Sequence, residues 1–200
     1  MPRVLSQDDV ADFRERLCEV ASRLYAIKGV GGVTMRELAS ALGVSPMTPY
    51  RYFHDKEEIL AAVRARAFDR FAEALETARA QPGASLERGR AVGQAYIRFA
   101  MEEPSSYRLM FDLSQPGEEA YPDLVRAMTR ARATMTAHVG GLQDEGLLQG
   151  DPELIGHVFW AMLHGVVSLH LAGKLGPKYD LATICQAAGQ ALSEGFRPKA

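Results

Sequence analysis

Residues 34–56, TMRELASALGVSPMTPYRYFHDK, contain the features that decide the fold of this chain. Four apolar residues recur there at the spacing that forms one face of a short helix. They are Met35, Leu38, Ala39 and Leu42. Thr34 stands where the cap of that helix belongs, and Glu37 three residues later completes a capping box. The pattern predicts a helix that begins directly after Thr34.

A turn and a second helix are expected next. Gly43 can adopt positive φ at little cost, so the chain can turn sharply there. Ser45 can cap a second helix, and Pro46 suits its first position. The backbone N–H that proline lacks makes no hydrogen bond within a helix at that position. Two short helices across a glycine-containing turn are typical of a helix-turn-helix.

The second helix has an outward face suited to DNA. If Pro49 and Phe53 face the first helix, the groups left outside are hydroxyls, a guanidinium and an apolar methyl group. Such groups bond phosphates and base edges or touch a thymine methyl. The residues predicted to contact DNA are Thr34, Arg36, Ser45, Pro46, Met47, Thr48, Tyr50, Arg51, Tyr52 and Lys56.

Lys56 lies in the first turn of a further helix, which Asp55 and Glu58 are expected to cap. A helix start disfavours a cation by roughly 0.3–1 kcal/mol, so a lysine there suits a docked phosphate. A solvated lysine is the alternative interpretation.

The motif G-V-S-x-x-x-x-Y-x-Y-F-x-x-K-E, from Gly43 to Glu57, resembles the DNA-binding signature of the tetracycline-repressor (TetR) family. Many members have an aliphatic residue in place of Pro49, although one branch also carries the proline. Proline there removes a helical hydrogen bond and crowds the carbonyl of Ser45, so the recognition helix should be short or irregular. Trp160, His164 and Gly165, with the segment 104–111, resemble a TetR C-terminal domain type named for Trp-His-Gly.

The chain has 200 residues, 47% of them apolar, and a formal net charge of −2, which allows one or two domains with a core. Residues 14–56 carry an excess of three positive charges, so the motif argues for DNA more strongly than the charge does. Cys18 and Cys185 have no CxxC spacing and are expected to be reduced core residues.

Apolar periodicity predicts an all-α fold, with a three-helix helix-turn-helix head at 1–54 and a helical bundle at 55–200. The resemblance to the TetR family implies that this bundle is the ligand-binding and dimerisation domain. In the head, we expect a first helix that ends near Gly29, with Ile27 on its apolar face and with Arg14 solvated or close to a phosphate. Beyond the head, we expect helices at 55–79, 85–102, 104–111, 122–146 with a break at Gly140–Gly141, 151–173 and 180–194. Asp151 and Asp180 are expected to cap the last two helices. No run approaching 18 uncharged apolar residues was identified, and the first 20 residues do not resemble a leader. We therefore expect a cytoplasmic protein with no membrane partner.

The helix at 151–173 is apolar nearly all round and has a stripe of mainly small residues. The stripe contains Leu154, Val158, Ala161, Gly165, Ser168 and Ala172. With the last helix, it predicts a four-helix interface in a homodimer. Packing inside one subunit is the alternative.

Large apolar residues on the body helices predict a small-molecule pocket with adaptable walls. They are Tyr96, Phe99, Tyr107, Met110, Phe111, Met135, Phe159 and Trp160, with Tyr107 and His164 as the polar anchors. Filling of the core is the alternative for each residue.

His157, His164 and His170 are spaced by seven and six residues, which does not suit a metal site on one helix. We found no nucleotide-binding loop or nucleophile elbow, and we expect no cofactor, no metal and no enzyme activity. The sequence predicts a ligand-responsive transcriptional regulator, a repressor that a small molecule releases from a pseudo-palindromic operator. A helical protein-interaction module and an enzyme of unrecognised type are the alternatives.

Overall fold

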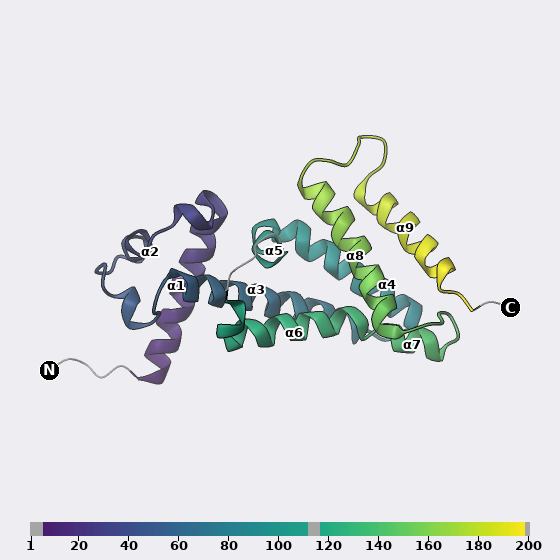
Figure 1. Ribbon diagram of the computed structural model, residues 1–200, viewed down its shortest axis with the longest axis horizontal. Helices are drawn as coiled ribbons and strands as arrows, with labels where there is room; N and C mark the ends of the chain where they lie inside the picture. The colour runs from purple at the N-terminus through teal and green to yellow at the C-terminus, as the bar shows by residue number, and fades with distance from the viewer. Residues whose placement is uncertain (1–5, 112–116, 199–200) are drawn as a thin grey trace. The chain divides into compact units, whose positions relative to one another are not determined.

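The computed structural model describes residues 6–111 and 117–198, and within these ranges the chain is helical, with no strand (Figure 1). The elements are α1 (Gln7–Lys28), η1 (Val30–Gly32), α2 (Met35–Ala41), η2 (Pro49–Arg51), α3 (Lys56–Arg79), α4 (Ser85–Glu102), α5 (Pro104–Phe111), η3 (Glu118–Ala120), α6 (Pro122–Thr136), α7 (Val139–Asp144), α8 (Pro152–Leu171) and α9 (Leu181–Gly195). The predicted all-α fold with an N-terminal helix-turn-helix is confirmed.

The chain forms two compact units, and α3 and α6 contribute to both. The first unit comprises Met1–Phe68 and Ser105–Met128, and the second comprises Asp69–Pro104 and Thr129–Ala200. The first unit therefore contains the helix-turn-helix together with the first half of α3 and with α5.

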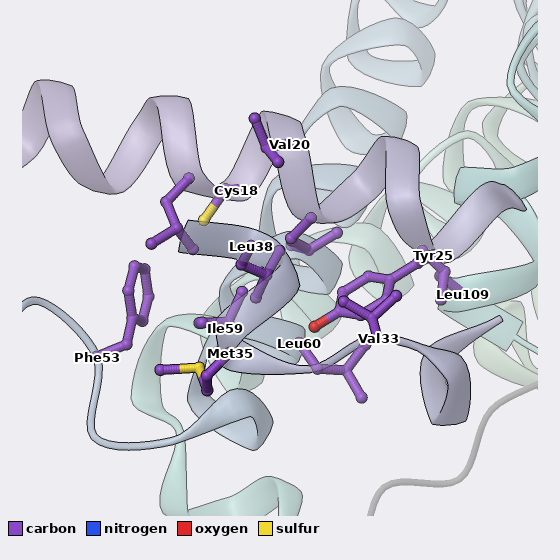
Figure 2. Packing of buried hydrophobic residues seen from close by; sticks show 13 residues of the cluster. Cys18, Val20, Tyr25, Val33, Met35, Leu38, Phe53, Ile59, Leu60 and Leu109 are labelled. Carbon is purple, nitrogen blue, oxygen red and sulfur yellow. The ribbon is translucent and has the colours of Figure 1, made fainter. Parts of the chain in front are cut away.

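The core of the first unit brings α1, α2, α3 and α5 together (Figure 2). Leu17, Leu38 and Ile59 are fully buried in this cluster, which also contains Phe53. Leu109 of α5 belongs to the same cluster. Cys18 is also buried here, and burial raises the pKa of its thiol, as expected for a core residue. Ile27, which the spacing placed on the apolar face of α1, is instead 78% exposed.

A buried arginine joins α3 to α5 in the first unit. Arg64 is only 2% exposed. Its Nε donates to the carbonyl of Leu109 at 2.9 Å, and Nη1 pairs with the carboxylate of Glu118. A guanidinium can be buried when its donors meet carbonyl and carboxylate oxygens.

In the second unit, α8 packs along α9 and also contacts α4 and α7 (Figure 1). A small cluster of Val139, Leu142, Leu148 and Ile155 joins α7 to α8. Asp151 and Asp180 cap α8 and α9 by accepting from the backbone N–H groups of Glu153 and Thr183. Both caps were predicted.

The helix expected at 122–146 breaks earlier than its glycines suggested. The structure places the break at Ala137–His138, and Gly140 and Gly141 lie inside α7. Two hydroxyls explain part of this difference: Thr134 and Thr136 donate to the carbonyls three residues before them, at 2.6 and 3.3 Å. Such bonds compete with the helical pattern and bend helices.

The prediction that the chain has no long uncharged apolar run is wrong for α8. By length and composition it could cross a membrane, with a mean hydropathy of 1.5 over an 18-residue window, of which 22% is buried. One such helix among the described residues is weak evidence for a membrane span. An apolar helix that packs against another protein chain has the same composition.

Candidate DNA-binding surface

The first helix of the motif is fixed by the predicted capping box. Thr34 Oγ1 accepts from the N–H of Glu37 at 3.2 Å, and Glu37 Oε2 accepts from the N–H of Thr34 at 2.9 Å. The other carboxylate oxygen of Glu37 lies 2.6 Å from Lys28 Nζ, and this pairing is the main reason that the pKa of Glu37 is lowered. Leu38 is buried and Arg36 is exposed, so α2 presents opposite faces to the core and to solvent.

The second helix of the motif is not a regular α-helix. Gly43 has φ of 68°, as predicted for the turn. After it, residues 46–48 form a turn and Pro49–Arg51 forms the 3-10 helix η2. The Ser45 carbonyl accepts from Thr48 N–H at 2.9 Å, because Pro49 has no N–H to donate four residues on. The predicted irregularity is therefore confirmed.

The expected cap at Ser45 is wrong in its detail. Its hydroxyl lies 3.3 Å from the hydroxyl of Thr48, so the contact joins two side chains. A side-chain cap on a backbone N–H requires a regular first turn, which this segment does not form.

Two residues of α1 hold the recognition segment (residues 45–52) in place. The guanidinium of Arg14 lies 3.9 Å from the centre of the Phe53 ring, donates to the carbonyl of Tyr52 and pairs with Glu58 at 3.2 Å. Phe13 stacks on the ring of Tyr52 at 4.0 Å between centroids. Arg14 is therefore not simply solvated, and the sequence gives no signal of this support role because its partners lie 38 and 44 residues away.

The outer surface of the recognition segment carries the predicted side chains. Pro49 and Phe53 are buried, as predicted, and the second is 2% exposed. Met47 and Tyr50 are 68% and 49% exposed, which is high for large side chains with apolar bodies. The other exposed candidates are Thr34, Arg36, Ser45, Pro46 and Arg51, whereas Thr48, Tyr52 and Lys56 are half-buried.

The start of α3 follows the expected capping pattern with one change. Asp55 Oδ1 accepts from the N–H of Glu58 at 2.8 Å, but Glu58 Oε2 accepts from the N–H of His54 rather than from that of Asp55. Lys56 lies in the first turn, with Nζ 4.0 Å from Glu57 Oε1 and 43% of its side chain exposed. At that distance Glu57 does not hold the ammonium group tightly, so Lys56 can reach a phosphate near the helix start.

The nine residues predicted to bind a ligand do not all lie in one unit. Tyr107, Met110 and Phe111 belong to the first unit, where Phe111 packs against Tyr107 at 4.9 Å between ring centroids. The other six belong to the second unit: Tyr96, Phe99, Met135, Phe159, Trp160 and His164.

In the second unit, aromatic rings pack beside three polar side chains that contact one another, those of Tyr96, His164 and Ser168. Phe71 meets the rings of Tyr96 and Phe99 edge-on, at 5.3 and 5.2 Å between centroids. Tyr96 Oη lies 3.4 Å from His164 Nδ1, and Ser168 Oγ lies 3.4 Å from His164 Nε2. Tyr96 and His164 are therefore in contact, whereas a pocket of about 360 Å³ in the same unit has a different lining. The ligand-binding set stays a prediction.

No group of three or more His, Cys, Asp and Glu residues suited to a metal ion occurs among residues 6–111 and 117–198.

An exposed helix-turn-helix surface on an all-α chain defines a class of DNA-binding proteins. Residues 17–63 match a family model described as bacterial regulatory proteins, tetR family. Residues 89–192, which include Trp160, His164 and Gly165, match a tetracyclin repressor-like C-terminal domain. The second match covers half of the chain, and the chain therefore belongs to the TetR family of transcriptional regulators.

The HTH-type transcriptional activator FasR of Mycolicibacterium smegmatis is 28% identical over 118 residues, which are 59% of this chain and 54% of that protein. The chain thus spans about half the length of this curated relative. A Rhodococcus sp. RHA1 protein of unknown function has a similar structure, with a TM-score of 0.82, 26% identity and coverage of 99% and 100% of the two chains. The TetR family regulator PfmR of Thermus thermophilus shares the fold, with a TM-score of 0.67, 24% identity and coverage of 88% and 97%.

Proposed function

We propose that this protein is a ligand-responsive DNA-binding transcriptional regulator of the cytoplasm, a repressor released from its operator by a small molecule. The exposed Met47, Tyr50 and Arg51, held out by the buried Pro49 and Phe53, are the observation that supports DNA binding most strongly. Their groups suit thymine methyls, phosphates and guanine edges. Residues 1–54 are the proposed DNA-binding domain and 55–200 the ligand-binding and dimerisation domain.

A transcriptional activator is the second candidate, because the relative FasR is named an activator. Both candidates require operator binding, and neither requires enzyme activity. A mobility-shift assay at low salt, with duplexes from the DNA that flanks the coding region, should give a discrete complex. An absence of any complex would favour a protein-interaction module or an enzyme.

The proposed homodimer would use α8 and α9. α8 leaves much apolar surface uncovered, including Leu154 at 56% and Leu169 at 48% exposure. A Cβ placed on Gly165 would meet no atom within 4 Å among the described residues, so this face is open for a second helix. A twofold mate that packs α8 and α9 against this face would complete a four-helix interface.

Gly165→Leu should move the protein toward monomer, because a Cβ there meets nothing in the described part of the chain, whereas the added bulk would crowd a close helix contact between two chains. Sedimentation equilibrium would measure the change. Operator affinity should fall as well, since one head reads only a half-site. A wild-type protein that is monomeric at micromolar concentration would contradict the dimer.

We propose that the six predicted residues of the second unit contribute to the effector site, where Tyr96 and His164 are in contact. Contact between Tyr96 and His164, and the aromatic packing of Phe71, Tyr96 and Phe99, support this proposal. An effector must favour the state with low DNA affinity, and a tenfold loss requires only about 1.4 kcal/mol of coupling.

Trp160 is the only tryptophan, so its emission should change when an inducer binds. Tyr96→Phe and Trp160→Phe should lower the affinity for that inducer. The first removes a hydroxyl, and the second removes part of the aromatic wall. A compound that releases DNA with unchanged Trp160 emission and unchanged affinity for both variants would place its site elsewhere.

A further inference from the structure

A polar pocket of about 360 Å³ lies in the second unit, where α3 ends, α4 begins and α6 gives way to α7. The side chains that bear on its chemistry are those of Arg79, Gln81, Ser85, Arg88 and His138. No carboxylate residue lines it. A volume of this size accommodates a small molecule, and the lining favours a negatively charged one.

Arg88 is a fixed wall of the pocket. Its Nη1 donates to the carbonyl of Gly83 at 2.6 Å, and its Nη2 donates to Ser85 Oγ at 2.8 Å. A Cβ on Gly141 would lie 2.6 Å from Ser85 Oγ and 3.6 Å from Arg88 Nη2. A side chain at position 141 would force the Ser85 hydroxyl to move, so Gly141 preserves the contact between Ser85 and the Arg88 guanidinium.

Two carboxylates near the pocket are already engaged outside its lining: Glu76 pairs with Arg130 at 2.5 Å, and Glu145 bonds to Ser85. Glu145 Oε1 accepts from the backbone N–H of Ser85 at 3.0 Å, and hydrogen bonding to Ser85 lowers the pKa of Glu145. This carboxylate therefore accepts a hydrogen bond from a backbone N–H group at the start of α4.

Arg79, the last residue of α3, has an exposed side chain. Within the described parts of the chain, its guanidinium has no hydrogen-bond or ion-pair partner. The planar fork of donors on an arginine matches the oxygens of a phosphate or a carboxylate. Arg79 therefore brings donors to the pocket that are available to a ligand.

His138 adds a neutral donor. Its ring lies against Gly89, where a Cβ would be 3.4 Å from Cδ2, and its Nδ1 is buried without a hydrogen-bond partner among residues 6–111 and 117–198. Burial, and next the charge of Arg79, lower the pKa of His138. We assign the proton of the neutral ring to Nε2, because a buried N–H without an acceptor costs more than a buried lone pair.

We propose that this pocket binds a small oxyanion, the phosphate or carboxylate group of a small molecule, through Arg79 and Arg88 with His138 beside them. The site is separate from the aromatic residues proposed for the effector, and it does not depend on DNA binding.

The test is a titration of the full-length protein with inorganic phosphate and, separately, with succinate, at constant ionic strength adjusted with sodium chloride. The NMR signals of the His138 ring should shift and saturate. Tighter binding of phosphate identifies the phosphate group as the ligand chemistry, and tighter binding of succinate identifies the carboxylate.

Arg79→Gln should weaken binding about tenfold, because it removes a charged donor from an exposed position without disturbing the core. Arg90→Gln is the matched control, since Arg90 is an exposed arginine of α4 outside the lining, and it should leave the affinity unchanged. The proposal is overturned if neither anion shifts the His138 signals more than chloride does. It is also overturned if Arg79→Gln binds like wild type, or if both variants weaken binding equally.

Discussion

Gly156→Ala is expected to lower the free energy of unfolding by about 2–3 kcal/mol, the upper part of the usual overpacking range. Gly156 of α8 is buried against the end of α6, where a Cβ would lie 2.6 Å from Thr136 Cγ2 and 2.8 Å from Thr136 Cα. The second atom is backbone, so the clash cannot be relieved by a side-chain rotation alone. For a chain of this size the melting temperature should fall by roughly 5–10 °C in a thermal unfolding experiment.

Gly140→Ala is the matched control, because Gly140 also lies in a helix of the second unit and a Cβ there meets nothing within 4 Å. It should be neutral or should stabilise by up to about 1 kcal/mol, as expected when alanine replaces an open helical glycine. Equal melting temperatures for the two variants would show that α6 and α8 do not approach as closely as the structure indicates.

Arg64→Met should destabilise the protein by about 3 kcal/mol. Removal of one partner from a buried pair leaves the other without compensation, typically at a cost of roughly 3–5 kcal/mol. The lower figure applies here because Glu118 keeps 25% of its side chain exposed, whereas Arg64 is 2% exposed. The carbonyl of Leu109 also loses its donor. Denaturant unfolding of the variant and the wild type would measure the difference.

The exposed pair Arg70–Glu103 provides the comparison, with side-chain exposures of 46% and 36%. Arg70→Met should cost less than about 1 kcal/mol, because solvent screens such a pair. If Arg64→Met were no more destabilising than Arg70→Met, the buried arginine would not stabilise α5 against α3.

Local features of the sequence predicted most of the fold. The capping box of Thr34 and Glu37 and the caps at Asp151 and Asp180 involve residues two or three positions apart, so the pattern contains both partners. The effect of Pro49 was predictable for the same reason, because a proline acts on the carbonyl four residues before it.

Features that depend on distant residues were not predicted. In the sequence, Arg64 has the pattern of an ordinary surface arginine. Its partners, Leu109 and Glu118, lie 45 and 54 residues further along the chain and contact it only in the folded structure. The small-residue stripe of α8 includes Gly165, whereas Gly156 is the glycine of α8 that has a close contact with another helix of the chain. Only the packing of α6 distinguishes the two.

The positions of the DNA-binding candidates in the chain followed from the motif, but their support by Phe13 and Arg14 did not. The stacking of Phe13 on Tyr52 and the position of Arg14 over Phe53 require that α1 cross the recognition segment. The polar pocket also had no signal in the sequence, since its residues come from three separate stretches of chain.

Binding of operator DNA by the recognition segment and the start of α3 is tested most directly by the salt dependence of binding with Lys56→Ala. Operator duplexes selected with the wild-type protein would be titrated by fluorescence anisotropy at several salt concentrations, with Lys174→Ala as a control for the loss of one exposed lysine outside the surface. We predict that Lys56→Ala weakens binding to all selected sequences alike and lowers the slope of log affinity against log salt by about one, because one phosphate contact is lost. Lys174→Ala should match the wild type. A Lys56→Ala protein with unchanged affinity and slope, or a wild-type protein from which no sequence can be selected, would contradict the account.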